Sequence, residues 1–266
     1  MAKSRMKKLP EKVRNLRLSL IATITVLLIL FTYLLPPHPQ PLEYHNFAND
    51  LELFGIPNFW NVFSNLPFLI VGILGLLFLR SPESNKHFVN KSEKTFYYSF
   101  FFSICLVCFG SSYYHLHPHN STLVWDRAPI VMSVAAIFSA MIYERVNKNL
   151  GHTVLFPFII VAISSAFYWF YTETKGVGDL RFYGFVQIYP LVIVPLLIIL
   201  LPGIYNSGKY ILMALASYGI ARLLEIFDVQ VFAFTHKIMA GHPIKHVFAA
   251  LGTYMVIVYL RKRKAN

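Results

Sequence analysis

The sequence alternates long apolar stretches with short polar connections. A helix that crosses about 30 Å of hydrocarbon needs roughly 20 mostly apolar residues. Eight stretches have about this length, with ends that the pattern fixes only to within a few residues. They cover residues 16–36, 60–80, 96–115, 121–143, 153–171, 183–202, 208–228 and 242–260. The pattern therefore predicts an all-α integral membrane protein whose short connections leave no room for a separate soluble domain.

The first stretch follows a basic flank, so it is either a cleaved signal sequence or a retained helix. It is long for a secretory core and ends in Leu35-Pro36-Pro37 without a small-residue cleavage site, which favours a retained anchor. We therefore expect a seven-transmembrane-helix bundle core plus one extra N-terminal transmembrane helix. The expected divisions are a basic N-terminus with the anchor at 1–42, the seven-span domain at 43–260, and a basic tail at 261–266.

Composition supports this class. Hydrophobic residues make up 56% of the chain and charged residues 14%, whereas soluble domains carry roughly 25% charged residues. An ordinary soluble enzyme and a disordered protein are therefore excluded. Cys105 and Cys108 lie together in an apolar run, where we expect them to pack rather than to form a disulfide framework.

The net charge of +12 suggests a nucleic-acid partner only until it is mapped along the chain. Seven of the 24 Lys and Arg residues lie in the first 17 positions and four in Arg261–Lys264. With the N-terminus inside, the inner segments carry 18 basic residues and the outer loops 3. This asymmetry is typical of membrane proteins and places both termini in the cytoplasm. We expect the bilayer as partner, with the basic tail marking topology and anionic lipid, and no nucleic acid.

Five polar residues in or beside the spans stand out, because ionisable groups in a membrane are costly and mark functional sites. Ser111 and His115 are four positions apart, on one face of the third span near its outer end. Asp126 lies near the outer start of the fourth span. His242 and His246 repeat the spacing of four at the start of the last span. The predicted topology brings all five to the outer face.

These residue types indicate a metal-dependent hydrolase. Three histidines with an open fourth position are the ligand set of a catalytic zinc site, so His115, His242 and His246 are the candidate ligands. Zinc activates water and polarises a carbonyl. Asp126 is the candidate general base and Ser111 the candidate donor to a developing oxyanion. The reaction that fits is hydrolysis of an amide or ester in a membrane-embedded substrate.

Simpler interpretations exist for each residue. Asp126 could instead pair with Arg127 or cap its helix, and Ser111 could bond only to its own helix. His117 and His119 lie in the polar turn between two spans, where we take them as ordinary interfacial side chains.

At these five residues the chain resembles the alkaline ceramidases. They belong to a superfamily of seven-span hydrolases that also includes the adiponectin-type receptors. The superfamily carries Ser-x-x-x-His on one span, Asp on the next and His-x-x-x-His at the start of the last, as here. The ceramidase branch adds an aromatic-Trp-Asn-x-x-Ser-Asn stretch, which matches Phe59–Asn65. Gly241–Ala250 and Glu225–Asp228 look similar to bacterial members, and the resemblance covers roughly 43–260.

The resemblance implies zinc held by His115, His242 and His246, with Asp126 positioning the water. The implied reaction is hydrolysis of the N-acyl bond of a ceramide-like lipid to a fatty acid and a sphingoid base. Eukaryotic members carry an acidic calcium-binding segment before this stretch. Here Asn58 replaces a glutamate of that pattern, so the calcium-binding pattern is incomplete and Ca²⁺ stays an alternative to the expected zinc. The short loops and the bacterial similarity favour a bacterial inner membrane, with the site near its outer face.

Two other functions stay open, besides hydrolysis of a different N-acyl lipid. One is a receptor-like or signalling member of the same superfamily; the other is a non-enzymatic metal handler. In the seventh span, we expect Arg222 and Glu225 to form an internal ion pair. Asp228, near the outer end of that span, could instead orient a zinc-binding imidazole.

Overall fold

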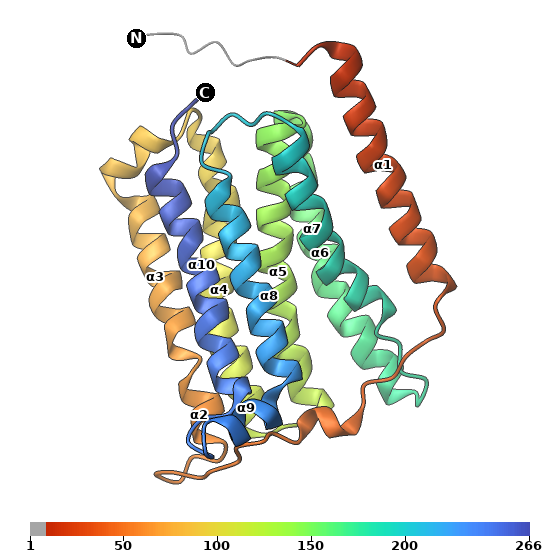
Figure 1. The fold of residues 1–266 in the computed structure, drawn as a ribbon, viewed down its shortest axis with the longest axis vertical. Helices are drawn as coiled ribbons and strands as arrows, with labels where there is room; N and C mark the ends of the chain where they lie inside the picture. The colour runs from red at the N-terminus through yellow and green to blue at the C-terminus, as the bar shows by residue number, and fades with distance from the viewer. Residues whose placement is uncertain (1–8) are drawn as a thin grey trace.

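The computed structural model describes residues 9–266, so residues 1–8 of the predicted basic N-terminus lie outside the described part. Most of the described residues are helical, and none lies in a strand. The described chain forms ten α-helices. They are arranged as a bundle with α1 at its side (Figure 1). They are α1 (Glu11–Leu34), α2 (Phe59–Phe63), α3 (Leu66–Arg80), α4 (Lys94–Leu116), α5 (Asn120–Arg145), α6 (Lys148–Thr174), α7 (Arg181–Leu200), α8 (Lys209–Ile226), α9 (Asp228–Phe234) and α10 (Gly241–Lys262). Short 3-10 helices are η1 (Leu42–His45), η2 (Pro82–His87) and η3 (Lys91–Glu93).

The lengths and composition of these helices confirm an all-α membrane bundle. Seven helical segments of the described chain are long and apolar enough to cross a membrane. An eighth crossing is reached only if α8 is counted together with α9, to which it is joined by a bend of 81°. The predicted span 208–228 is therefore a straight helix only to Ile226. The bend carries Asp228 to the start of α10, where its carboxylate accepts a backbone N–H.

The central helix of the bundle is α5. About 72% of its apolar window is buried, against 6% for α1. Helix α5 packs against α4 and α6, α4 also packs against α3, and α8 packs against α10. Helix α1 contacts mainly α7 and lies at the side of the bundle (Figure 1), as expected for an extra N-terminal helix.

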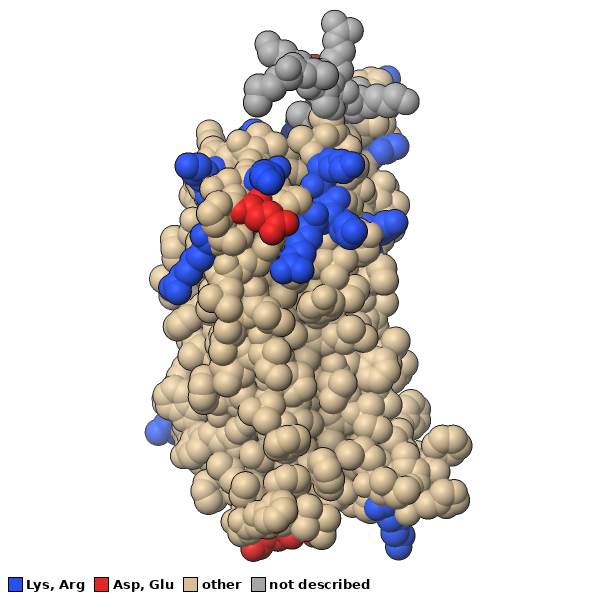
Figure 2. Space-filling model, turned by 90° about the vertical axis from the view of Figure 1, so that its left-hand side faces the viewer, with Lys and Arg blue, Asp and Glu red and all other residues tan. Residues whose placement is uncertain are grey.

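The two ends of the bundle differ in charge. The start of α1 and the C-terminus lie at the same end (Figure 1), as an even number of crossings requires. Lys and Arg side chains gather at this end on the face shown in Figure 2. This matches the sequence pattern of 18 basic residues on one side and 3 on the other. Which side is the cytoplasm stays a prediction.

The basic tail predicted at 261–266 needs one correction. Helix α10 continues to Lys262, and the Arg263 side chain is fully buried instead of facing lipid headgroups. Its guanidinium lies 3.2 Å from Oε1 of Glu144 and 3.4 Å from Oε2 of Glu93. The pairing forms because a buried carboxylate needs a cation. Sequence analysis missed it because both acids are far from Arg263 in the chain.

Candidate metal centre and its cavity

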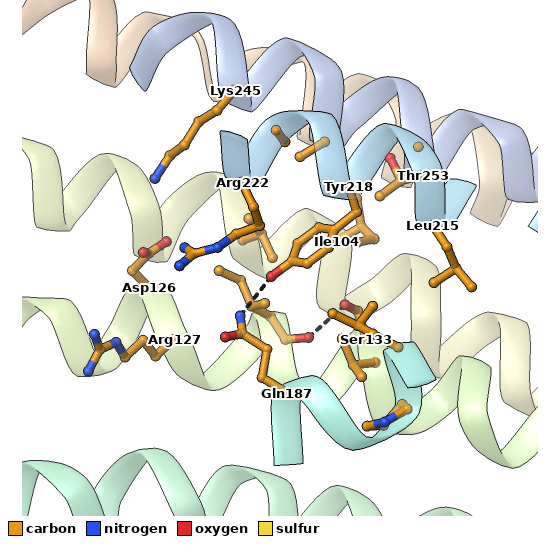
Figure 3. Close-up of a pocket in the computed structure, with 18 of the residues that line it drawn as sticks. Ile104, Asp126, Arg127, Ser133, Gln187, Leu215, Tyr218, Arg222, Lys245 and Thr253 are labelled. Carbon is orange, nitrogen blue, oxygen red and sulfur yellow. Dashed lines mark hydrogen bonds between the residues drawn. The ribbon is translucent and has the colours of Figure 1, made fainter. Parts of the chain in front are cut away.

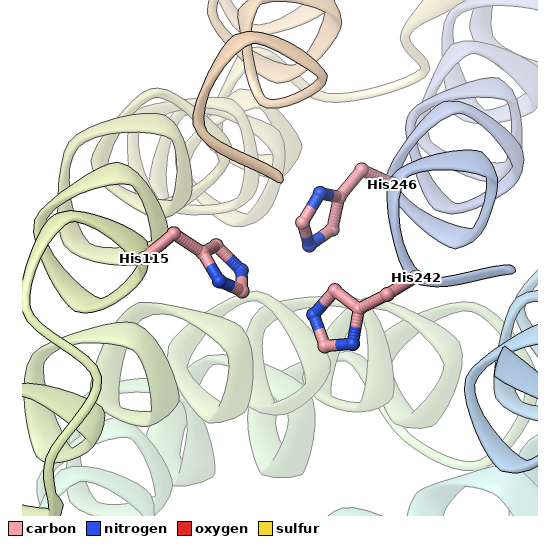
Figure 4. A group of neighbouring side chains, drawn as sticks. All are labelled: His115, His242 and His246. Atoms are coloured by element: carbon pink, nitrogen blue, oxygen red, sulfur yellow. The ribbon is translucent and has the colours of Figure 1, made fainter. Parts of the chain in front are cut away.

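Three histidines meet at the end of the bundle opposite the termini. His115 comes from the last turn of α4, and His242 and His246 from the first two turns of α10. One ring nitrogen from each lies within 4.8 Å of the other two, and all three side chains are buried. The rings face one another in Figure 4. The structure thus brings the three predicted ligands together as a group that could hold a metal ion.

The ring nitrogens fit a metal. Nδ1 of His115 and Nε2 of His242 are buried without a hydrogen-bond partner. Unsatisfied buried polar atoms are costly, and a bound cation would accept these lone pairs. Nδ1 of His246 is held by the Ser64 hydroxyl at 2.8 Å, so Nε2 is its free nitrogen. A partner on the second nitrogen is typical of histidines that bind metals.

The start of α10 is fixed by Asp228. Its Oδ1 accepts the backbone N–H of His242 at 2.6 Å, and its Oδ2 accepts that of Ala48 at 2.9 Å. A carboxylate in this place satisfies free N–H groups and complements the helix dipole. The Asp228 side chain therefore positions α10 by binding the backbone of His242, and not by binding an imidazole ring. A Cβ on Gly241 would lie 2.2 Å from the Leu224 carbonyl oxygen, so the close approach of α8 and α10 here requires glycine.

The segment before α2 covers the three histidines. The Phe47 ring lies edge-on to His115 and His242, with centroids 4.8 and 4.7 Å away. His45 contacts the Tyr114 hydroxyl and Oδ1 of Asn120, each at 3.0 Å. In the described chain, the three histidines form the one group of at least three His, Cys, Asp or Glu with converging ligand atoms. Sequence analysis considered the segment before α2 only as a calcium site and did not predict that it covers the histidines.

Ser111 and Asp126 lie beside the metal-ligand group. Together with His246 they line one cavity of about 460 Å³. Ser111 is buried one turn before His115, and Asp126 comes from α5. The two helices touch at Gly110, where a Cβ would lie 2.1 Å from the Trp125 carbonyl oxygen. The fold thus brings all five candidate residues to the same end of the bundle.

The simpler interpretations can now be compared with the structure. No salt bridge joins Asp126 to Arg127 in the described part of the chain, although the two are neighbours. His119 caps α5, with its side chain accepting the Ser121 N–H, and His117 follows the end of α4. Neither belongs to the metal-ligand group, as expected.

The cavity has one polar end and one apolar end. It lies between α4, α5, α7, α8 and α10. In Figure 3 the labelled charged side chains, Asp126, Arg127, Arg222 and Lys245, lie toward one end. Apolar residues line most of the rest, among them Ile104, Val107, Ile130, Leu191, Leu215 and Val256. An amphiphile has the same division between a polar head and an apolar chain.

Glu225 organises the polar end. It forms the predicted ion pair with Arg222 and a second one with Lys245. It also accepts the Tyr44 hydroxyl at 2.9 Å. Burial, followed by the charge of Glu225, raises the pKa of Tyr44 well above its ordinary value, so this hydroxyl stays a donor. Sequence analysis did not single out Lys245, although a lysine between two ligands of one span was a signal.

Comparisons with known proteins add no family to this description. No protein-family model and no curated protein matches the chain. Its function is therefore argued from the site.

Proposed function

We propose that this protein is a membrane-embedded, zinc-dependent amidase of the alkaline ceramidase type. It hydrolyses the N-acyl bond of ceramide-like lipids to a fatty acid and a sphingoid base. The observation that carries the proposal is the placement of the three histidines beside Ser111 and Asp126. That polar end leads into a cavity with mostly apolar walls.

The donor set favours zinc. Three imidazoles are the protein ligands of catalytic zinc sites that keep the fourth position open. They are buried, and two of their nitrogens have no protein partner. A zinc ion held by these residues supplies a Lewis acid that activates water and polarises the amide carbonyl.

The surrounding side chains supply the proton transfers. Asp126 takes a proton from the attacking water as the bond to the carbonyl carbon forms. Ser111 donates its hydroxyl hydrogen to the oxygen on which negative charge develops. The C–N bond then breaks, and Asp126 returns the proton to the leaving nitrogen. The products are a fatty acid and a free amine, so atoms and charge balance.

The cavity matches the shape of such a substrate. Its volume of about 460 Å³ falls within the range of roughly 300–1,000 Å³ that is typical of small-molecule sites. The acyl chain lies between the helices while the amide lies at the polar end. With the orientation given by the loop charges, the site faces the outer side of a bacterial inner membrane.

The test is fatty-acid release by the purified, zinc-loaded protein from a panel of ceramides and other N-acyl lipids. Asp126→Asn should retain zinc, measured as bound metal per chain, but lose at least about a hundredfold in turnover. His242→Ala should lose the zinc as well. Glu52→Gln, which changes an exposed carboxylate, is the matched control and should leave both unchanged.

Two outcomes would contradict the proposal. Full turnover in Asp126→Asn would remove the assigned role of that carboxylate. No release from any lipid while zinc stays bound would overturn the amidase and favour a receptor-like protein.

A further inference from the structure

Arg127 is a buried cation without a carboxylate partner. Its side chain lies in α5, directly after Asp126, and the residue is 6% exposed. One guanidinium nitrogen, Nη2, donates to Oε1 of Gln40, whereas Nη1 has no hydrogen-bond partner. The guanidinium carbon lies 4.0 Å from the centre of the Trp169 ring and 4.8 Å from that of Tyr183. The Tyr44 ring lies 5.8 Å away, so one neutral oxygen and three aromatic rings are its compensation.

The two other buried arginines of the described chain have different partners. Arg145 donates to the backbone carbonyl oxygens of Ile198 and Leu201. Arg263, buried at the opposite end, pairs with Glu144 and Glu93. Among the described residues, no Asp or Glu oxygen lies within salt-bridge distance of Arg127. Because arginine stays charged in proteins, a buried guanidinium without an anion is costly. Aromatic contacts offset part of that cost.

The cavity that Arg127 lines carries an excess of positive charge. Its wall contains three cationic side chains, Arg127, Arg222 and Lys245, and two carboxylates, Asp126 and Glu225. Glu225 is paired with both Arg222 and Lys245. Asp126 lines the same wall but forms no salt bridge with Arg127. Among the three cations of this wall, Arg127 is therefore the one without a salt bridge.

We propose that Arg127 binds an anionic headgroup, so that the cavity selects N-acyl amphiphiles whose head carries a carboxylate or a phosphate. The guanidinium, whose Nη1 has no protein partner, donates to the anion, and its planar fork suits both oxyanions. The acyl chain occupies the apolar part of the cavity. As a substrate preference, the inference rests on the proposed amidase and narrows its ceramide-like lipids to those with an anionic head, since ceramide itself is neutral. As a binding preference, it can be tested without turnover.

The experiment uses three ethers that share a dodecyl chain and contain no amide to hydrolyse. They are dodecyloxyacetate, 2-(dodecyloxy)ethyl phosphate and the neutral 2-(dodecyloxy)ethanol. Dissociation constants are measured by calorimetry with zinc-loaded protein in a nonionic detergent. At least one anionic ether should bind about tenfold or more tightly than the alcohol, and the tighter of the two identifies the headgroup class. Equal binding of all three would overturn the proposal.

Variants separate Arg127 from the metal as the source of the preference. Arg127→Gln should abolish the preference, and Arg127→Lys, which keeps the charge, should retain part of it. The preference should persist in His242→Ala, which removes a metal ligand. It should also persist in Arg181→Gln, which removes a cation outside this cavity. A preference that survives Arg127→Gln, or disappears in His242→Ala, would overturn the proposal. Failure of lipid hydrolysis leaves this binding result standing, so the two failures can be told apart.

Discussion

The Ser64 hydroxyl lies 2.8 Å from Nδ1 of His246, although 182 positions separate the two residues in the chain. The contact holds the imidazole ring and leaves Nε2 as the nitrogen that can face a metal. Ser64 belongs to the Phe59–Asn65 stretch, where its neighbours also bind one another: Asn65 Nδ2 donates to the Asn61 carbonyl at 2.8 Å. The stretch therefore supports a ligand of the candidate site.

Ser64→Ala should weaken zinc binding about 10- to 100-fold, because partners that orient a ligand contribute on this scale. Zinc affinity is measured by competition with a chelator of known strength. Ser103→Ala is the matched control, since Ser103 is also buried but bonds only to a carbonyl of its own helix. Unchanged affinity in Ser64→Ala would show that the ring is held by packing alone.

Much of this structure could be predicted from hydrophobic periodicity and ligand spacing. The eight apolar stretches and the i, i+4 pairs at 111/115 and 242/246 are local patterns, and a membrane restricts helices to crossings in sequence order. Given the topology, Ser111, Asp126 and the three histidines had to lie near one face. Local pattern was therefore sufficient for the metal-ligand group.

The contacts that complete the site join segments far apart in the chain. The ion pair of Lys245 with Glu225 depends on how α10 packs against α8. The contacts of Gln40 with Arg127 and of Phe47 with the histidines depend on how a connecting segment folds over helix ends. No periodicity encodes such pairs. The bend after Ile226 was missed for the same reason, since the carboxylate of Asp228 is engaged by backbone groups of α10 and of the covering segment.

Gly110→Ala should disrupt the site from a distance. The added Cβ would overlap the Trp125 carbonyl oxygen at 2.1 Å, so α4 and α5 must separate where Ser111 and Asp126 face the cavity. We expect a lower unfolding temperature in detergent, a loss on the order of 1–3 kcal/mol, and reduced zinc retention. Gly219→Ala, where no atom lies within 4 Å of the new Cβ, should be neutral or slightly stabilising. Equal stability of both variants would contradict the close approach.

His45 should make the covering segment sensitive to acid. Burial lowers the pKa of His45 below its ordinary value of 6.5. At a pH between the two pKa values, the imidazole is therefore neutral in the folded protein and protonated in the unfolded chain. Since the unfolded state binds more protons, the free energy of unfolding falls as the pH drops below 6.5 toward the lower, folded-state pKa.

The measurement is the loss of unfolding temperature between neutral pH and pH about 5.5, with zinc removed from every sample. The unfolding temperature of His45→Gln should fall less than that of the unsubstituted protein. The unfolding temperature of His38→Gln, in an exposed position of the same connection, should fall as much. A His45→Gln variant with the full loss would place the acid sensitivity elsewhere.

Zinc removal should destabilise the folded protein. Nδ1 of His115 and Nε2 of His242 have no protein partner, so without zinc these buried nitrogens would have no partner at all. A ligand that binds only the folded state contributes about 2.7 kcal/mol at a free concentration one hundred times its dissociation constant. Chelation should therefore lower the unfolding temperature, and added zinc should restore it. His242→Ala, which lacks one ligand, should respond to neither treatment. An unchanged unfolding temperature in the chelated, unsubstituted protein, with loss of metal verified by elemental analysis, would mean that packing alone holds the three histidines together.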